Sequence, residues 1–297
     1  MTAVADAAVV RSRRSPRPPL RPGPAFVSWL LGCAVALAVW GLVYPVLVGT
    51  LQEQDAQQQL FAHFRSQLSQ ATAPIGPTGY GRAVALLSVP EAGIKDAVVV
   101  EGTGGADLQK GPGHLRSTVL PGQPGTSVLM GRAVTFGAPF AQIDDLRAGD
   151  AITVTTGQGT FRYLVERVRR PGDPLPVPPA VSQSRLTLAS SYGTGWRARL
   201  APTSQVYVDA LLQGKPAPAS GVLPPATPAS EQVMGSSTDS LLLLVVWLQL
   251  LLLAVAALVW LAWRWGRRRT WLVAVPVLLA LAIGASTSAA QLLPNTF

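Results

Sequence analysis

The chain has 297 residues, which is enough for one domain of ordinary size together with membrane segments. Only 13% of the residues are charged and 48% are hydrophobic, a balance typical of a membrane protein. The net charge of +9 would suit a nucleic-acid-binding protein, but most of it lies in two short arginine clusters beside apolar segments. This distribution argues against nucleic acid as a partner and points to a membrane surface.

The first arginine cluster lies in residues 1–25, which we expect to form a cytoplasmic basic tail. Residues 26–49 then run without a charge and are long enough to cross a bilayer. A cleaved signal peptide is the alternative. The run is too long for a signal-peptide core, and no clear A-x-A cleavage site follows it. We therefore expect an uncleaved first transmembrane helix.

Residues 50–81 are predicted to form a stalk helix and a linker. The helical part, 51–71, carries four apolar side chains on one face: Leu60, Phe61, Phe64 and Leu68. We interpret this helix as a plain stalk. The following stretch, 72–81, is rich in Gly and Pro, which is typical of a linker.

Residues 82–212 have the length of one compact domain and contain short apolar runs bounded by turn residues. The expected strands are Ala83–Val89, Asp96–Val100, Ser127–Met130, Ala151–Thr155, Thr160–Val168, Leu186–Ala189 and Gln205–Ala210. The segment Gly157–Gly159 separates two of them and predicts a β-hairpin. Seven short strands with turn signals predict a closed or sandwiched β domain.

Residues 213–240 are rich in Pro and Ala and are predicted to be a linker that returns to the membrane. Residues 241–263 and 271–290 are free of charge, and we expect them to form the second and third transmembrane helices. The second arginine cluster lies between them, in the basic turn 264–270.

The positive-inside rule places both arginine clusters in the cytoplasm. It then places the β domain and the tail 291–297 outside the cell, and the N-terminus inside. We therefore predict a multi-pass protein of the cell membrane with three spans and an extracytoplasmic domain.

Four stretches of the β domain resemble the sortases of Gram-positive cell envelopes, most closely those of classes E and D. They are ALLSVPEAGIKDAVVVEGT (85–103), LQKGPGHLRSTVLPGQPG (108–125), SVLMGRAVTFGAPFAQIDDLRAGDAI (127–152) and LTLASS (186–191). The resemblance implies the family's closed eight-stranded β-barrel with short helices. The expected fold class is thus mainly β, a sortase-like closed β-barrel domain with short helices, plus three transmembrane α-helices.

Sortases are transpeptidases in which a cysteine thiolate attacks the Thr–Gly bond of an LPxTG-type sorting signal. A histidine acts as acid and base, and an arginine stabilises the oxyanion. By resemblance, the cysteine position falls at Ser191 and the histidine position at Arg132, in MGRA. The arginine position falls at Arg199 or, less well, at Arg197. The chain is therefore identified as a degenerate family member that lacks the catalytic cysteine and histidine.

A serine nucleophile needs an adjacent general base, and Arg132 cannot serve because a guanidinium stays protonated in proteins. His63 lies in the predicted stalk, and His114 lies in a GPGH turn that the family has in addition to its catalytic histidine. The sequence therefore predicts an inactive pseudo-sortase, a binding or scaffold module for cell-envelope proteins or sorting-signal peptides. The alternative, a divergent transpeptidase or hydrolase with Ser191 as nucleophile, stays open, so enzymatic activity is left undecided.

Arg132, Arg197 and Arg199 could line the old groove and bind an anion such as a carboxylate or a phosphate. The alternative for Arg132 is a solvated or acid-paired loop residue. No metal or cofactor is expected, since the only cysteine is Cys33 and no Cys/His cluster occurs. An active sortase or another membrane protein is a further candidate partner.

The sequence Leu293–Phe297 reads LPNTF and matches L-P-x-T. In a chain so rich in Leu and Pro, one such match occurs by chance roughly one time in four. A true sorting signal would precede a span and a basic tail, whereas this one follows a span, which also disfavours an adhesin or pilin subunit. We interpret the match as accidental, and the alternative is that it acts as a tethered pseudo-ligand for the groove.

Overall fold

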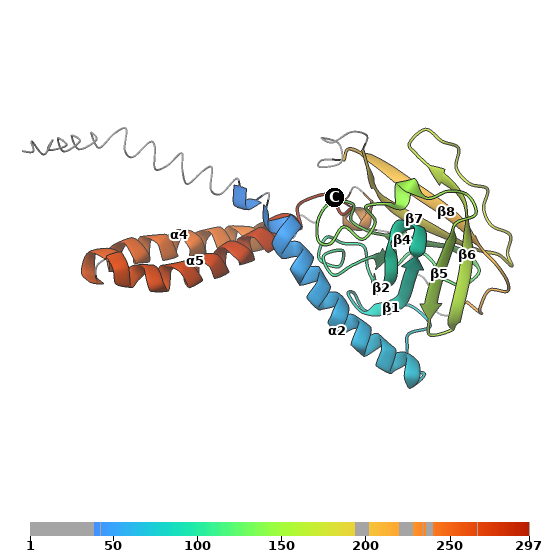
Figure 1. Cartoon of the computed structure of the whole chain (residues 1–297), viewed down its shortest axis with the longest axis horizontal. Coiled ribbons are helices and arrows are strands. Elements are labelled where there is room, and N and C mark those ends of the chain that lie inside the picture. The colour runs from blue at the N-terminus through green and yellow to red at the C-terminus, as the bar shows by residue number, and fades with distance from the viewer. Residues whose placement is uncertain are drawn as a thin grey trace, which may run out of the picture. The chain divides into compact units, whose positions relative to one another are not determined.

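The computed structural model describes seven stretches of the chain, shown as coloured ribbons in Figure 1. They are residues 39–41, 43–193, 202–219, 228–233, 235, 240–265 and 267–296. Most of the predicted first transmembrane helix, 26–49, lies outside these residues, so that prediction is not tested here.

Eight strands form a closed barrel in the order β1-β2-β3-β4-β7-β8-β6-β5. They are β1 (Ala83–Val89), β2 (Ile94–Glu101), β3 (Gly113–His114), β4 (Gly125–Met130), β5 (Ala151–Thr156), β6 (Gly159–Arg169), β7 (Ser184–Tyr192) and β8 (Ser204–Leu212). Antiparallel pairing of β1 with β5 closes the barrel. The expected closed eight-stranded barrel is confirmed, and each of the seven predicted strands overlaps an observed one.

The predicted hairpin at Gly157–Gly159 is also confirmed, because β5 and β6 pair antiparallel and the last pair joins Thr156 to Gly159. The sequence did not reveal β3, since two residues in a Gly-rich turn carry no strand periodicity. Short 3-10 helices interrupt the connections: η2 (Pro90–Ala92), η3 (Ile143–Asp145) and η4 (Ala229–Glu231).

Two of the barrel contacts are parallel, and one of them positions the candidate site. Strands β4 and β7 pair in parallel, with Met130 beside Ala189. The carboxyl ends of neighbouring parallel strands lie at the same edge of a sheet. Residues that follow Met130 are therefore brought next to residues at the end of β7.

The helix α2 (Gly49–Ser69) follows the short π-helix η1 (Tyr44–Val48) and packs on the barrel. Phe64 is fully buried in a cluster with Ala73, Ala83 and Val98, so the predicted apolar face docks on β1 and β2. Gln57 adds hydrogen bonds to the backbone of Val98. The expectation of a plain stalk is wrong, because the apolar face of the helix is buried rather than solvated.

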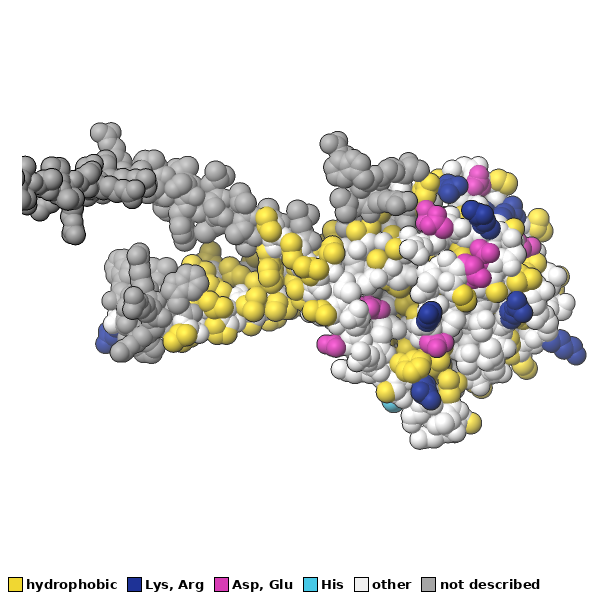
Figure 2. Space-filling view, viewed as in Figure 1, with side chains coloured by type: hydrophobic (Ala, Val, Ile, Leu, Met, Phe, Trp, Pro, Cys, Tyr) yellow, Lys and Arg dark blue, Asp and Glu magenta, His cyan; other side chains and the backbone are white. Residues whose placement is uncertain are grey.

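The helices α4 (Ser240–Trp265) and α5 (Arg267–Ala290) form an antiparallel pair (Figure 1). Both contain stretches long and apolar enough to cross a membrane, Ser240–Leu258 and Leu272–Ala290. Hydrophobic side chains cover the described surface of this pair in Figure 2, and almost none of the apolar windows is buried. These helices match the predicted second and third spans, and they are the two such helices in the described part of the chain.

The predicted linker 213–240 is more than a tether, because its described parts pack on the barrel. Glu231 accepts a hydrogen bond from the Tyr80 hydroxyl through Oε1 (2.7 Å) and one from Thr103 Oγ1 through its backbone carbonyl (2.7 Å). Val233 is buried with Leu108, Met130 and Ala189. The Pro- and Ala-rich composition predicted a linker, but it could not show that the barrel offers partners for that linker.

We predict that Phe64→Ala weakens the docking of α2. The change leaves a cavity under the helix, and removal of a buried Phe side chain typically costs about 3–5 kcal/mol. Denaturant unfolding of the full chain, followed by circular dichroism, measures the effect. His63→Ala is the control, because His63 is exposed on the same helix and should change the free energy of unfolding by less than about 0.5 kcal/mol. Equal effects of the two changes would contradict the docked helix.

We also predict a pH dependence that comes from Glu53 in α2. Burial raises the pKa of its carboxyl from 4.5 to about 7. Folded protein therefore keeps this proton between the two values while unfolded protein releases it, so the stabilisation present below pH 4.5 is lost as the pH rises to 7. Glu53→Gln, which mimics the protonated form, should leave the thermal midpoint nearly unchanged at pH 4.5 and raise it at pH 7.5. Asp55→Asn changes an exposed carboxyl on the same helix and should leave the thermal midpoint unchanged at both pH values. If Glu53→Gln raised the midpoint equally at both pH values, the assignment to Glu53 would be refuted.

Candidate functional site

Ser191 lies near the end of β7, beside the loop that leaves β4. Its neighbour Ser190 donates a hydrogen bond from Oγ to the carbonyl of Gly131 (2.8 Å), which ties the two segments together. Gly131 has no room for a side chain, because an added Cβ would lie 2.5 Å from the Phe140 ring. The parallel pairing thus brings together the two positions that the sequence resemblance singled out, Ser191 and Arg132.

Arg132 is fully buried directly after this glycine. Its guanidinium donates hydrogen bonds to Thr135 Oγ1 (3.0 Å) and to the carbonyl of Gly105 (3.2 Å), and it lies over the Phe136 ring, 4.9 Å from the centroid. It forms no ion pair with a described carboxylate, and its Nε has no hydrogen-bond partner there. The interpretation as a solvated residue is therefore wrong, and among the described residues Arg132 is not paired with an acid either.

Burial lowers the pKa of Arg132 to about 10, because the charged form loses its hydration. The side chain still carries its proton at neutral pH, so it cannot accept one from a serine. Arg197 and Arg199 lie outside the described residues. A shared anion site of the three arginines stays a prediction.

Neither histidine is placed to activate Ser191. His114 is buried, with Nδ1 3.1 Å from Glu101 Oε2 and Nε2 2.9 Å from the carbonyl of Val119. Both ring nitrogens thus have partners inside the barrel wall, as expected of a structural histidine. His63 is exposed on α2, which packs against β1 and β2 rather than at the end of β7.

The partner of the Ser191 hydroxyl is a peptide carbonyl. Ser191 Oγ donates a hydrogen bond of 2.6 Å to the carbonyl oxygen of Thr296. The backbone N–H of Ala133 donates to the same oxygen at 3.0 Å. Thr296, the last residue of the L-P-x-T match, therefore lies at the sortase-like site, and the interpretation of this match as accidental did not anticipate that position.

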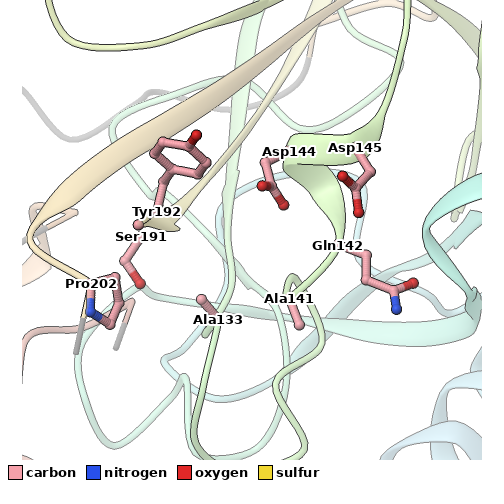
Figure 3. Close-up of a pocket in the computed structure, with 9 residues that line it drawn as sticks. Ala133, Ala141, Gln142, Asp144, Asp145, Ser191, Tyr192 and Pro202 are labelled. Carbon is pink, nitrogen blue, oxygen red and sulfur yellow. The ribbon is translucent and has the colours of Figure 1, made fainter. Parts of the chain in front are cut away.

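A cavity of about 280 Å³ opens beside Ser191 (Figure 3). Strand β7 contributes Ser191 and Tyr192 to one side, and η3 contributes Asp144 and Asp145 to the other. Ala133, Ala141, Gln142, Gly193 and Pro202 complete the lining. The two carboxylates give the cavity an acidic side. Sequence reasoning missed them, because acidic residues in a loop are usually solvated and only the fold places these in the same cavity as Ser191.

The arrangement can hold a peptide carbonyl, since a hydroxyl and a backbone amide both donate to one oxygen. It does not activate a nucleophile, because the hydroxyl proton points to a carbonyl and not to a base. Within the described residues, no group of three or more His, Cys, Asp or Glu side chains could hold a metal ion. The site as described is thus a binding geometry made from protein groups.

Comparison with known proteins identifies the domain. The family model for the sortase domain matches residues 87–197. Sortase D of Bacillus subtilis is 30% identical over 89 residues, which is 30% of this chain and 43% of that protein. The match thus spans less than half of that relative.

Solved structures similar to this chain include a sortase D5 transpeptidase from Clostridium perfringens. It has 20% identity and a TM-score of 0.46, over 54% of this chain and 99% of that one. A sortase E mutant from Streptomyces avermitilis has 28% identity and a TM-score of 0.37, over 46% of this chain and 91% of that one. The domain that contains residues 87–197 thus matches the sortase domain family, and the relatives found are sortases.

Proposed function

We propose that this protein is a membrane-anchored pseudo-sortase, whose barrel binds a cell-envelope protein or a sorting-signal peptide without cleaving it. One observation carries the proposal. The hydroxyl at the proposed nucleophile position, Ser191, donates a hydrogen bond of 2.6 Å to a backbone carbonyl, that of Thr296. A carbonyl accepts a hydrogen bond but does not remove a proton, so the site holds a peptide and leaves the hydroxyl unactivated.

The missing chemistry has two parts. A serine hydroxyl needs a base to become a nucleophile, and the leaving amine needs a proton donor. Arg132, at the histidine position, is buried and protonated, and it donates to Gly105 and Thr135. His114 uses both ring nitrogens elsewhere. These contacts support a role in binding rather than in transpeptidation.

The site is suited to recognise the backbone of a peptide. The Ser191 hydroxyl and the Ala133 amide donate to one carbonyl, so they can bind the main chain of an extended peptide independently of its side chains. The sortase domain supports a peptide as the general class of partner. An active sortase or another membrane protein could present that peptide beside this chain.

The proposed setting is the outer face of a cell membrane. The described surface of α4 and α5 is apolar nearly all round, which suits lipid rather than water. With a third span at 26–49, both arginine clusters would be cytoplasmic and the barrel extracytoplasmic. Reporter fusions placed in 1–25, 82–212 and 264–270 test this topology.

The alternative function is a divergent hydrolase or transpeptidase with Ser191 as nucleophile. The carboxylates of Asp144 and Asp145 line the same cavity and are its acidic groups. For catalysis, the hydroxyl would have to turn from Thr296 toward one of them. The two functions differ in whether a covalent ester forms at Ser191.

We predict that no ester forms. The full chain in lipid nanodiscs, mixed with an LPxTG-type peptide and an amine acceptor, should show neither cleavage nor an acyl adduct by mass spectrometry. Ser191→Ala should behave like the unchanged chain in this assay. An adduct on Ser191 that is absent from Ser191→Ala would establish the alternative function instead.

A second prediction concerns the groove. The double change Arg132→His with Ser191→Cys restores a thiol and a proton carrier at the two family positions. With peptide in millimolar excess, we expect a thioester on Cys at position 191 in the double variant and in neither single variant. A double variant that folds but forms no thioester would mean that the groove no longer accepts sorting-signal peptides.

A further inference from the structure

The segment that follows α5 enters the site rather than leaving it. Helix α5 ends at Ala290, and six residues later the Thr296 carbonyl accepts the hydrogen bonds of Ser191 and Ala133. Asn295 and Thr296 are both completely buried. Polar residues so deeply buried at the end of a segment require specific partners, since a buried polar group without one is unfavourable.

Those partners form a slot in the segment 228–235. Asn295 Nδ2 donates to the carbonyls of Ser230 (2.6 Å) and Gln232 (2.8 Å). Thr296 Oγ1 donates to the carbonyl of Val233 (2.9 Å), and the Asn295 backbone N–H donates to Gly235 (2.9 Å). On one side of the slot, backbone carbonyls accept hydrogen bonds from the side chains of Asn295 and Thr296. On the other side, Ser191 and Ala133 donate hydrogen bonds to the Thr296 carbonyl.

The helix that carries the segment is itself held at the barrel. Gln109 Nε2 donates to the carbonyl of Thr287 (3.4 Å), and Gly105 lies against the backbone of Gln291, where an added Cβ would come within 3.2 Å. A tether this short raises the local concentration of the attached segment to the order of millimolar. The segment therefore competes strongly with any peptide that arrives from outside.

The fit has one defect. Asn295 Oδ1 is buried and has no hydrogen-bond partner in the described structure. An unpaired buried acceptor weakens the hold of the slot on this residue. The segment is thus bound by many contacts but not perfectly matched, which suits an occupant that can be displaced.

We propose that residues 293–296 are an intrachain ligand of the Ser191 site, which they occupy in competition with extended Leu-Pro-x-Thr peptides in trans. This inference rests on the proposed peptide-binding function and adds its regulation. A partner peptide gains access only when it displaces the segment. The membrane helices, which present the segment, are then part of the binding switch.

Thiol accessibility tests occupancy without any peptide. In full chain carrying Cys33→Ser and Ser191→Cys, the thiol at position 191 is the only one, and the alkylation rate with iodoacetamide in nanodiscs reports its exposure. Removal of residues 293–297 should raise the rate at least tenfold. Asn295→Leu should raise it by a smaller factor, since two donors to the slot are lost. Equal rates with and without the segment would overturn the proposal.

Two controls keep this result interpretable. Gln70→Leu makes the same kind of amide-to-leucine change at an exposed position after α2 and should leave the rate unchanged. Asn295 is the only asparagine of the chain, so ¹⁵N-asparagine labelling of the unaltered protein gives one backbone amide signal. Slow hydrogen exchange of that amide is expected from its bond to Gly235, and fast exchange would contradict occupancy even if the deletion variant failed to fold.

Peptide binding separates this inference from the proposed function. With Ser191 in place, a fluorescent acetyl-Leu-Pro-Asn-Thr-amide peptide should bind the chain without residues 293–297 at least tenfold more tightly than the full chain. If the peptide bound equally to the full chain and to the chain without residues 293–297, and the alkylation rates were also equal, the intrachain ligand would be refuted. The proposed peptide-binding function would not be affected. Faster alkylation without peptide binding to either chain would refute the proposed function and the competition, and would leave only an intrachain contact.

Discussion

The structure of the site depends on one hydrogen-bonded oxygen, the carbonyl of Thr296. A hydroxyl can donate a single hydrogen bond, and Ser191 donates it to this oxygen rather than to a base. The Ala133 amide fixes the same oxygen from the β4 side of the site. Because β4 and β7 are parallel neighbours, this one carbonyl joins both strand ends to a segment that follows the last helix. The hydrogen bond of the Ser191 hydroxyl and the occupation of the site by residues 295–296 are thus two aspects of the same geometry.

Arg132 has a structural role at this edge of the barrel. Its guanidinium is fully buried and pairs with no carboxylate of the described residues. Such burial is unfavourable unless hydrogen bonds and an aromatic face compensate for the lost hydration. Gly105, Thr135 and Phe136 provide that compensation. The side chain therefore links the loop after β2 to the loop after β4. Its contacts are those of a structural residue, which explains why a protonated group is tolerated in a buried position beside Ser191.

The segments outside the barrel are integrated with it more closely than their composition suggests. Glu231 connects the Pro-rich segment to Tyr80 and Thr103. The Tyr44 hydroxyl lies 2.6 Å from Thr287 Oγ1, so the chain before α2 contacts the helix that presents the Leu-Pro-Asn-Thr segment. The membrane-proximal helices are consequently joined to the site by covalent and hydrogen-bonded connections rather than by a flexible linker.

The sequence by itself determined the strands of the β domain and the two apolar helices, and its resemblance to the sortases predicted the closed barrel. Alternating apolar runs and the Gly157–Gly159 turn specify local strand pairing, and the absence of a cysteine or histidine at positions 191 and 132 is visible without coordinates. Only the tertiary structure decided where Arg132 is buried, which acids face the cavity and what occupies the slot. The physical reason is that a short run such as Leu293–Thr296 has no internal periodicity or core of its own. Its position in the fold is determined by partners from distant parts of the chain, namely Ser191 of β7 and the carbonyls of Ser230, Gln232 and Val233.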